Sequence, residues 1–341
     1  MTQTLTVSNS TLSGNSASNF GGGIFNDAHN SSATLTVNNS TLSGNSAAFG
    51  GGIFSRAFQG FATLTVNNCT LSGNSASVDG GGILNNAVQG SATLTINNST
   101  LSGNSAAFGG GIFYTFGFVG SATLTIGSTI LNAGASGENI FNGVGTVASN
   151  GYNLSSDAAG GDGTTVPGGF LNATGDIRNT NPVLGPLANN GGPTFTHALL
   201  FSSSPAIDKG KNFTTATTDQ RGPGFARTVD LGFPKPTGGD GTDIGAFEAQ
   251  TLPPPPPCPL GQGNWKNNPA AWPASALPMT LGSQTYTQTE LLTILMTPIG
   301  KGTKADASLI LADQLIAAKL NIANGADGTP VISTIMNADS Y

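Results

Sequence analysis

The chain has very little charge for its length. Of 341 residues, 11 are Lys or Arg and 17 are Asp or Glu, which gives a net charge of −6. Binding to nucleic-acid phosphates requires clustered basic side chains, and the few present here are scattered. We therefore expect no nucleic-acid partner. Within residues 1–137 the formal charges are Asp27, Arg56 and Asp79 alone.

Cysteines and long apolar runs are also scarce. The longest apolar stretches are short, such as LLTILM at 291–296. A segment that crosses a bilayer needs roughly 20 apolar residues, so no membrane-spanning segment is expected. Cys69 and Cys258 lie in different segments and predict no disulfide framework. Cys69 stands where other repeats have Ser, which indicates a small buried slot. The start, MTQTLTV, has no signal-peptide pattern and lies inside a repeat, so we expect any export signal to lie upstream.

What the sequence has in excess is glycine, at 50 residues, and repetition. LTV or LTI begins at 5, 35, 64, 94 and 124, SGN at 13, 43, 72 and 102, and GGGI at 21, 50, 80 and 109, so the period is 29 or 30 residues. Each unit holds three short stretches with apolar alternation, separated by Asn and Gly turn signals. This pattern predicts an all-β right-handed parallel β-helix with three short strands per coil.

The alternation assigns side chains to the inside and the outside of each coil. Leu35, Val37, Leu42 and Ile53 should point inward and stack on their equivalents, about 4.8 Å away in the next coil. Asn at the corners should tolerate left-handed backbone or form ladders, as at 39, 68 and 98 and at 45, 74 and 104. The outward residues of the first strand form two threonine columns, Thr4, Thr34, Thr63, Thr93 and Thr123 beside Thr6, Thr36, Thr65, Thr95 and Thr125.

The repeat fades after residue 137 and charged residues return. We interpret 138–250 as irregular coils and a C-terminal cap, because a solenoid must close its last coil against water. The residues predicted to form ion pairs in this cap are Asp219, Arg221, Asp243 and Glu248. Ion pairing is favoured over catalysis for these four.

A polyproline stretch at 251–257 predicts a semi-rigid linker, and 258–341 a small α-helical module. Thr287 and Glu290 form a capping-box pattern before a helix that Pro298 stops. A second helix is expected over about 304–323, and Thr329-Pro330 has the pattern of a third helix start. Trp265 and Trp272 are expected in the core of this module.

Particular motifs resemble a known class of proteins. The alternation of SGNSA and GGGIF resembles the repeats of secreted right-handed parallel β-helix proteins, including polymorphic outer-membrane protein repeats of autotransporter-like adhesins. The segment at 181–210, with TDQRG at 218–222 and TDIGAFE at 242–248, is similar to the bacterial choice-of-anchor Q domain. The resemblance implies a surface protein with a C-terminal anchoring element. The chain departs from it in showing no sorting tail and in having FART at 225–228 where an Arg-Pro pair is common.

These observations favour a non-catalytic extracellular or cell-surface structural or adhesive solenoid. Its partner would be a glycan, a matrix or cell-surface ligand, or a second copy stacked end to end. One alternative is a carbohydrate-active β-helix enzyme, such as a polysaccharide lyase or hydrolase, although the repeats contain no Glu and only two Asp to supply paired carboxylates. The other is ice binding through the outward threonine columns.

We expect no cofactor and no metal. His29 and His197 lie far apart in the sequence without ligand spacing. Calcium binding by Asp residues of Gly-rich loops, at 157, 162, 240 and 243, is a less favoured reading.

Overall fold

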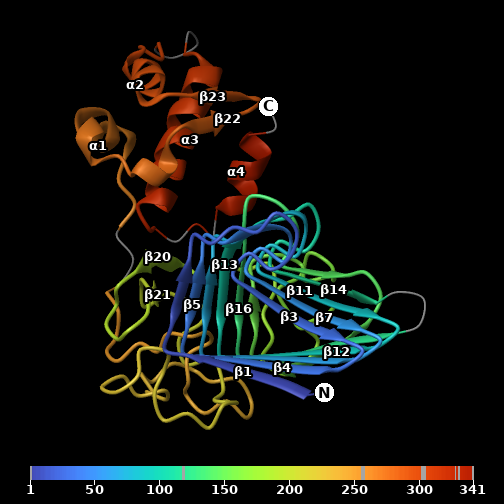
Figure 1. Cartoon of the computed structure of the whole chain (residues 1–341). Coiled ribbons are helices and arrows are strands. Elements are labelled where there is room, and N and C mark those ends of the chain that lie inside the picture. Colours follow the sequence, from blue (N-terminus) through green and yellow to red (C-terminus); the bar gives the residue numbers. More distant parts are fainter. Residues whose placement is uncertain are drawn as a thin grey trace. The chain divides into compact units, whose positions relative to one another are not determined.

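The structure is a computed structural model that describes residues 2–116, 120–254, 258–300, 305–326, 328 and 331–339. The chain forms two compact units, Met1–Pro253 and Pro254–Tyr341, and each is described by itself. The predicted linker at 251–257 lies only partly within the described residues, and Thr329-Pro330 lies outside them. Parallel strands stacked in about five turns confirm the predicted parallel β-helix in the first unit (Figure 1).

Three parallel sheets line the solenoid. The first, here called the threonine sheet, consists of β1 (Thr2–Ser8), β4 (Ser32–Asn38), β8 (Phe61–Asn67), β12 (Ser91–Asn97), β15 (Ser121–Gly127) and β18 (Thr146–Gly151). The second, the covered sheet, consists of β2 (Thr11–Ser13), β5 (Thr41–Ser43), β9 (Thr70–Ser72), β13 (Thr100–Asn104), β16 (Ile130–Ala133) and β19 (Leu154–Ser155). The third, the aromatic sheet, consists of β3 (Ile24–His29), β7 (Ile53–Phe58), β11 (Ile83–Val88), β14 (Ile112–Phe116) and β17 (Ile140–Asn142).

A short fourth ladder lies between the covered and aromatic sheets and was not predicted. It pairs β6 (Ser46–Phe49) with β10 (Ser75–Asp79), and isolated bridges extend it to the turns before and after. Two turns therefore have four strands, and the turns on either side of them have the three that were predicted.

The core is built by stacking like on like. Leu35 pairs with Leu64 and Leu64 with Leu94 in unbroken register, and all three are fully buried. Burial of a leucine side chain contributes about 2 kcal/mol. Since every turn repeats the same inward residues, each side chain finds a neighbour of its own shape above and below. The predicted inward positions at 37, 42 and 53 are confirmed in the same way.

The two corners differ in which residue adopts the left-handed backbone conformation. Asn39 adopts a left-handed φ of 48°, as expected, but at the next corner Gly44 has the left-handed φ, 61°, and Asn45 does not. Gly51 is needed for a separate reason, since a Cβ there would lie 2.3 Å from the Ser75 carbonyl oxygen of the following turn. Close approach between turns explains the repeated glycines.

Asn45 belongs to a buried side-chain ladder that runs through successive turns. The backbone and side-chain nitrogens of Asn45 donate to Asn74 Oδ1 at 3.0 and 2.9 Å. Asn74 in turn donates through Nδ2 to Asn104 Oδ1 at 2.9 Å and to the Leu42 carbonyl at 3.0 Å. The ladder satisfies polar groups that the tight turn would otherwise bury without partners.

Cys69 occupies a second ladder at the neighbouring corner. It is fully buried and takes the place of a serine, with its Sγ 3.4 Å from the Ser40 backbone nitrogen and 3.1 Å from the Asn67 carbonyl. Burial raises the pKa of this thiol to about 12. The predicted buried slot is confirmed.

Two carboxylates accept hydrogen bonds from the last turn, and one of them ends the ladder that contains Cys69. The backbone nitrogen of Asn139 donates to Asp157 Oδ2 at 2.7 Å, and that of Asn153 donates to Asp176 Oδ1 at 2.9 Å. Leu171 of the intervening loop is fully buried and joins the core of the solenoid. This loop, residues 156–180, closes the C-terminal end of the stack.

Arg178 holds the closing loop together from within. Only 1% of the residue is exposed. Its guanidinium donates to the carbonyls of Ala158 and Asp162 at 3.0 Å and to that of Val166 at 2.9 Å. One buried cation thus satisfies three carbonyls of a loop that has little secondary structure of its own.

The second unit is a small helical module with one hairpin. Its elements are α1 (Gln262–Asn267), two short 3₁₀ helices, η1 (Pro269–Ala271) and η2 (Ala274–Ala276), β22 (Met279–Leu281), β23 (Gln284–Tyr286), α2 (Gln288–Met296), α3 (Ala307–Ala323) and α4 (Ile332–Ala338). The capping box of Thr287 and Glu290 is present. Trp265 and Trp272 are buried in the core of the module, as predicted.

The helix expected from about residue 304 begins at Ala307, because Asp306 caps its first turn. Residue 304 itself lies outside the described residues. The hairpin of β22 and β23 was not predicted, and its strands are only three residues long.

Replacing Asn74 by Ala tests the buried ladder. The change removes the acceptor of two hydrogen bonds and the donor of two others, so we expect a loss of about 3 kcal/mol in the free energy of unfolding. Urea denaturation followed by circular dichroism measures it. The control is Asn67→Ala in the half-exposed outer ladder, where bonds of 3.2 and 3.3 Å predict a loss below about 1 kcal/mol. Equal losses for the two variants would contradict the structural role given to the inner ladder.

Candidate functional site

The outward threonines form two columns in strict register on the threonine sheet. Thr34 pairs with Thr63 and Thr63 with Thr93, and the column beside it is aligned in the same way. The structure brings all ten predicted residues together, since both columns run from β1 to β15. Thr146 of β18 extends the first column, whereas Ala148 ends the second. The threonines from β4 to β15 are half-buried, so their hydroxyl and methyl groups remain accessible.

The rest of this face is polar and uncharged. An outer ladder joins Asn67 to Asn38 and Asn97 to Asn67 through their side-chain amides. On the other side of the threonines, Phe61 takes the place of the serines found in the neighbouring strands and is 66% exposed. The face is therefore a flat array of hydroxyl and amide groups interrupted by one aromatic ring.

Threonines on the outer face of the covered sheet are buried. Thr41, Thr70 and Thr100 are at most 1% exposed, because the segment 184–250, here called the flanking segment, packs over them. Gln220 donates to Thr41 Oγ1 at 2.9 Å and accepts from Thr70 Oγ1 at 2.6 Å. The Thr100 hydroxyl accepts from the backbone of Ala246 at 3.0 Å. One segment thus binds the hydroxyls of three successive turns.

The flanking segment has a single short hairpin, β20 (Leu184–Ala188) with β21 (Thr196–Leu199). His197 of this hairpin joins it to the covered sheet, since its Nε2 lies 2.9 Å from Ser72 Oγ and its Nδ1 2.7 Å from the Gly185 carbonyl. Burial lowers the pKa of His197. This histidine therefore supports the packing of the segment.

A buried ion pair organises the remainder of the flanking segment. Arg221 Nε and Nη2 donate to Asp219 Oδ2 at 3.0 and 2.6 Å, and both side chains are almost completely buried. The guanidinium carbon lies 3.9 Å from the Phe225 ring centroid and 3.8 Å from that of Phe247, so two rings sandwich it.

Asp243 and Glu248 complete this network. Glu248 accepts backbone hydrogen bonds from Val229 at 2.8 Å and from Asp243 at 2.9 Å, and its Oε2 lies 3.4 Å from Arg227 Nη2. Burial raises the pKa of Glu248 to about 9 and that of Asp243 to about 7, while the charge of Arg227 lowers both. These carboxyl groups accept hydrogen bonds from their own segment's backbone, so the arrangement stabilises the segment.

The four predicted cap residues thus come together, but on the flank of the solenoid. The sequence suggested that they close the last coil. In the structure the loop 156–180 closes it, and the flanking segment lies against turns that include Thr41 near the start of the chain. Instead of closing the last coil, the flanking segment hydrogen-bonds the hydroxyls of Thr41, Thr70 and Thr100 along the covered sheet.

The third sheet carries an aromatic face that was not predicted from the sequence. Phe25 stacks on Phe54 with ring centroids 5.2 Å apart, and Phe113 stacks on Phe141 at 5.0 Å. Arg56 lies over the Phe25 ring and forms an ion pair with Asp27. The signal was available, since IF recurs after three of the four GGG motifs and places Phe at an outward position.

Other candidate chemistry is weaker. Among the described residues, no group of three His, Cys, Asp or Glu side chains could hold a metal ion. No helix in the part of the chain that the structure describes is long and apolar enough to cross a membrane. Comparisons with protein-family models, with curated proteins and with solved structures find no match to this chain.

Replacing Arg221 by Lys tests the sandwiched ion pair. The ammonium group of lysine keeps the charge but loses the bidentate contact with Asp219 and the planar stack between the rings. We therefore expect the free energy of unfolding to fall by about 2 kcal/mol. Thermal denaturation measures it as a lower Tm. The control is Lys235→Met, which breaks the exposed pair with Asp230 and should change the free energy by less than about 1 kcal/mol. An unchanged Tm for the Arg221 variant would show that the stack does not stabilise the segment.

Proposed function

We propose that the protein is a non-catalytic structural and adhesive solenoid that acts outside the cell or on its surface. The observation that carries this proposal is the contrast between two threonine faces of the same solenoid. The hydroxyls of the covered sheet bind the chain's own flanking segment, whereas those of the threonine sheet stay accessible. An accessible face of the same chemistry is suited to bind an external partner.

The partner class follows from the chemistry of the face. Regularly spaced hydroxyl and amide groups can donate and accept hydrogen bonds but offer no charge, which suits a neutral polymer with its own hydroxyl groups. We propose a glycan of a matrix or cell surface. The aromatic ring of Phe61 provides a flat apolar contact within this face. The buried carboxyl groups of the flanking segment support binding over catalysis.

An extracellular location is supported by the sequence rather than by the geometry. The SGNSA and GGGIF repeats and the TDQRG and TDIGAFE motifs resemble secreted and surface-anchored proteins. Self-association is a further proposal, since β1 stands at the edge of the threonine sheet with its residues largely exposed.

Adhesion is tested with a face-directed variant. The full chain, immobilised on beads, should retain at least one polymer from a panel of neutral glycans and matrix glycoproteins. Replacing both Thr65 and Thr95 by Lys should reduce the bound fraction more than about tenfold, because two bulky charges interrupt the array. The control replaces both Gln59 and Gln89 by Lys, which adds the same two charges at an exposed corner of the solenoid and should leave binding unchanged. No retention of any polymer, or equal retention by the double variant, would refute the adhesive role.

Ice binding is the second candidate, and the register of the two threonine columns favours it. Threonines repeat along each column at the strand spacing of about 4.8 Å, which gives a flat lattice of methyl and hydroxyl groups.

A thermal-hysteresis measurement decides this second candidate. If the lattice binds ice, the protein should shape ice crystals, and replacing Thr36, Thr65 and Thr95 by Tyr should abolish the shaping. The control is Gln89→Tyr on the same scaffold, which should leave it intact. Absence of ice shaping by the unmodified protein, or shaping unaffected by the three substitutions, would exclude it.

A further inference from the structure

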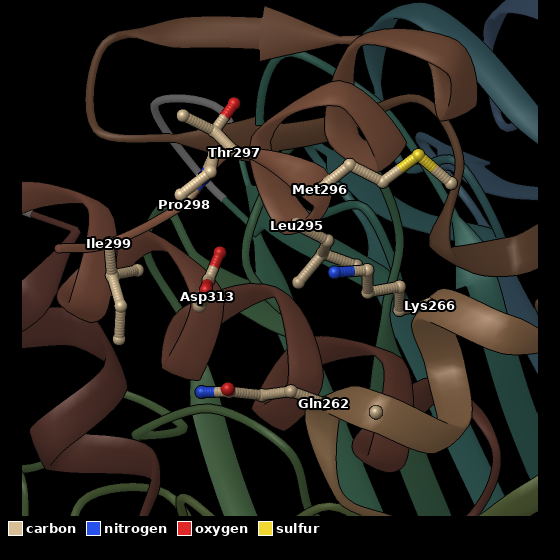
Figure 2. Close-up of a pocket in the computed structure, with 9 residues that line it drawn as sticks. Gln262, Lys266, Leu295, Met296, Thr297, Pro298, Ile299 and Asp313 are labelled. Carbon is tan, nitrogen blue, oxygen red and sulfur yellow. The ribbon is translucent and has the colours of Figure 1, made fainter.

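The helical module contains a cavity that the solenoid's proposed function does not use. Its volume is about 420 Å³, a size common for small-molecule sites. Three elements form it, namely α1, the C-terminal end of α2 with the loop that follows, and α3 (Figure 2). The residues that line it are Gln262, Gly263, Lys266, Leu295, Met296, Thr297, Pro298, Ile299 and Asp313.

Asp313 is the unusual member of this lining. It is only 7% exposed, and its Oδ1 has no hydrogen-bond partner in the structure. An acidic group buried without a donor costs free energy, and the burial also raises its pKa. A helix that only had to pack would place an apolar residue here. No donor among the described residues reaches this oxygen, which leaves Asp313 able to accept a hydrogen bond from a ligand.

Lys266 supplies the opposite charge on another wall. Figure 2 shows its amino group and the Asp313 carboxylate directed into the same cavity from α1 and α3. Among the described residues, Lys266 forms no ion pair within 4.0 Å, although its charge lowers the pKa of Asp313. The two charges face one space without neutralising each other directly.

The other walls combine polar groups, from Gln262 and Thr297, with apolar side chains. Leu295 is buried, while Met296 and Ile299 are 57% and 38% exposed around the opening. These flexible side chains can pack against an apolar group of a ligand. The last turn of α2 contains no basic residue, so its carbonyl end adds partial negative charge near the cavity.

We propose that this cavity binds a small zwitterion of the amino-acid class with an apolar side chain. The ammonium group pairs with Asp313, the carboxylate pairs with Lys266, and the side chain lies against Leu295, Met296 and Ile299. A simple amine would leave Lys266 without an anion, and a simple carboxylate would leave Asp313 without a donor.

The test uses the full chain and isothermal titration calorimetry with L-leucine and L-methionine. At least one should bind saturably. N-acetyl-leucine lacks the ammonium group and leucinamide lacks the carboxylate, so each should bind at least about tenfold more weakly, as expected for loss of one charged pair. Asp313→Asn and Lys266→Met should each weaken binding of the amino acid by a similar factor. The control Asp339→Asn removes a charge that pairs with Lys319, outside this cavity, and should bind normally.

Stability gives a second readout that a purely structural Asp313 would not produce. Since Asp313 is buried without a partner, Asp313→Asn should raise the Tm of the unliganded protein while weakening binding. The proposal fails if neither amino acid binds, if the truncated analogues bind as well as leucine, or if Asp313→Asn lowers the Tm and leaves binding unchanged.

Discussion

Each turn of the solenoid is bonded to the next in the same register along three sheets, and this axial stacking is the constraint on which the other features depend. A residue at one position of a turn lies directly over its equivalents. A side chain that packs well in one turn can therefore be repeated in every turn, and one that packs badly would destabilise every turn. Leucines stack on leucines inside, the Asn45 and Asn74 amides bond to one another at a corner, and glycines recur where turns approach too closely for a Cβ.

The same stacking turns single outward residues into columns, and the columns have different fates. Hydroxyls of the covered sheet are bound by Gln220 and Ala246 of the flanking segment. Hydroxyls of the threonine sheet stay accessible, and phenylalanines of the third sheet stack on one another. The flanking segment is itself ordered by a buried network around Arg221 and Glu248, since it has little regular secondary structure. Its hydrogen bonds to Thr41, Thr70 and Thr100 join three successive turns.

The sequence predicts what is periodic and misses what is not. The inward leucines, the threonine columns and the capping box of the helical module follow from local patterns that repeat or have a known spacing. The bonds from Gln220 to Thr41 join residues 179 positions apart, so no local pattern reveals them. Arg178 and Asp313 were missed for a similar reason. Their importance lies in burial and in partners, or the lack of them, that only the folded chain defines. Phe25 belongs to a motif that repeats in the sequence, but its outward stacking was not predicted.

The two carboxylates that bind the last turn distinguish the C-terminal end of the stack from its repeating turns. Asp157 and Asp176 accept hydrogen bonds from the last turn, and the loop that contains them turns back over the core instead of continuing the ladder. Extra units of 29 or 30 residues could be added before the turn of Thr41 without changing the contacts of this loop or of the flanking segment. Duplication of a unit in the gene would lengthen the solenoid and leave the closing loop unchanged. The length of such a protein can therefore evolve separately from the structure of its C-terminal end.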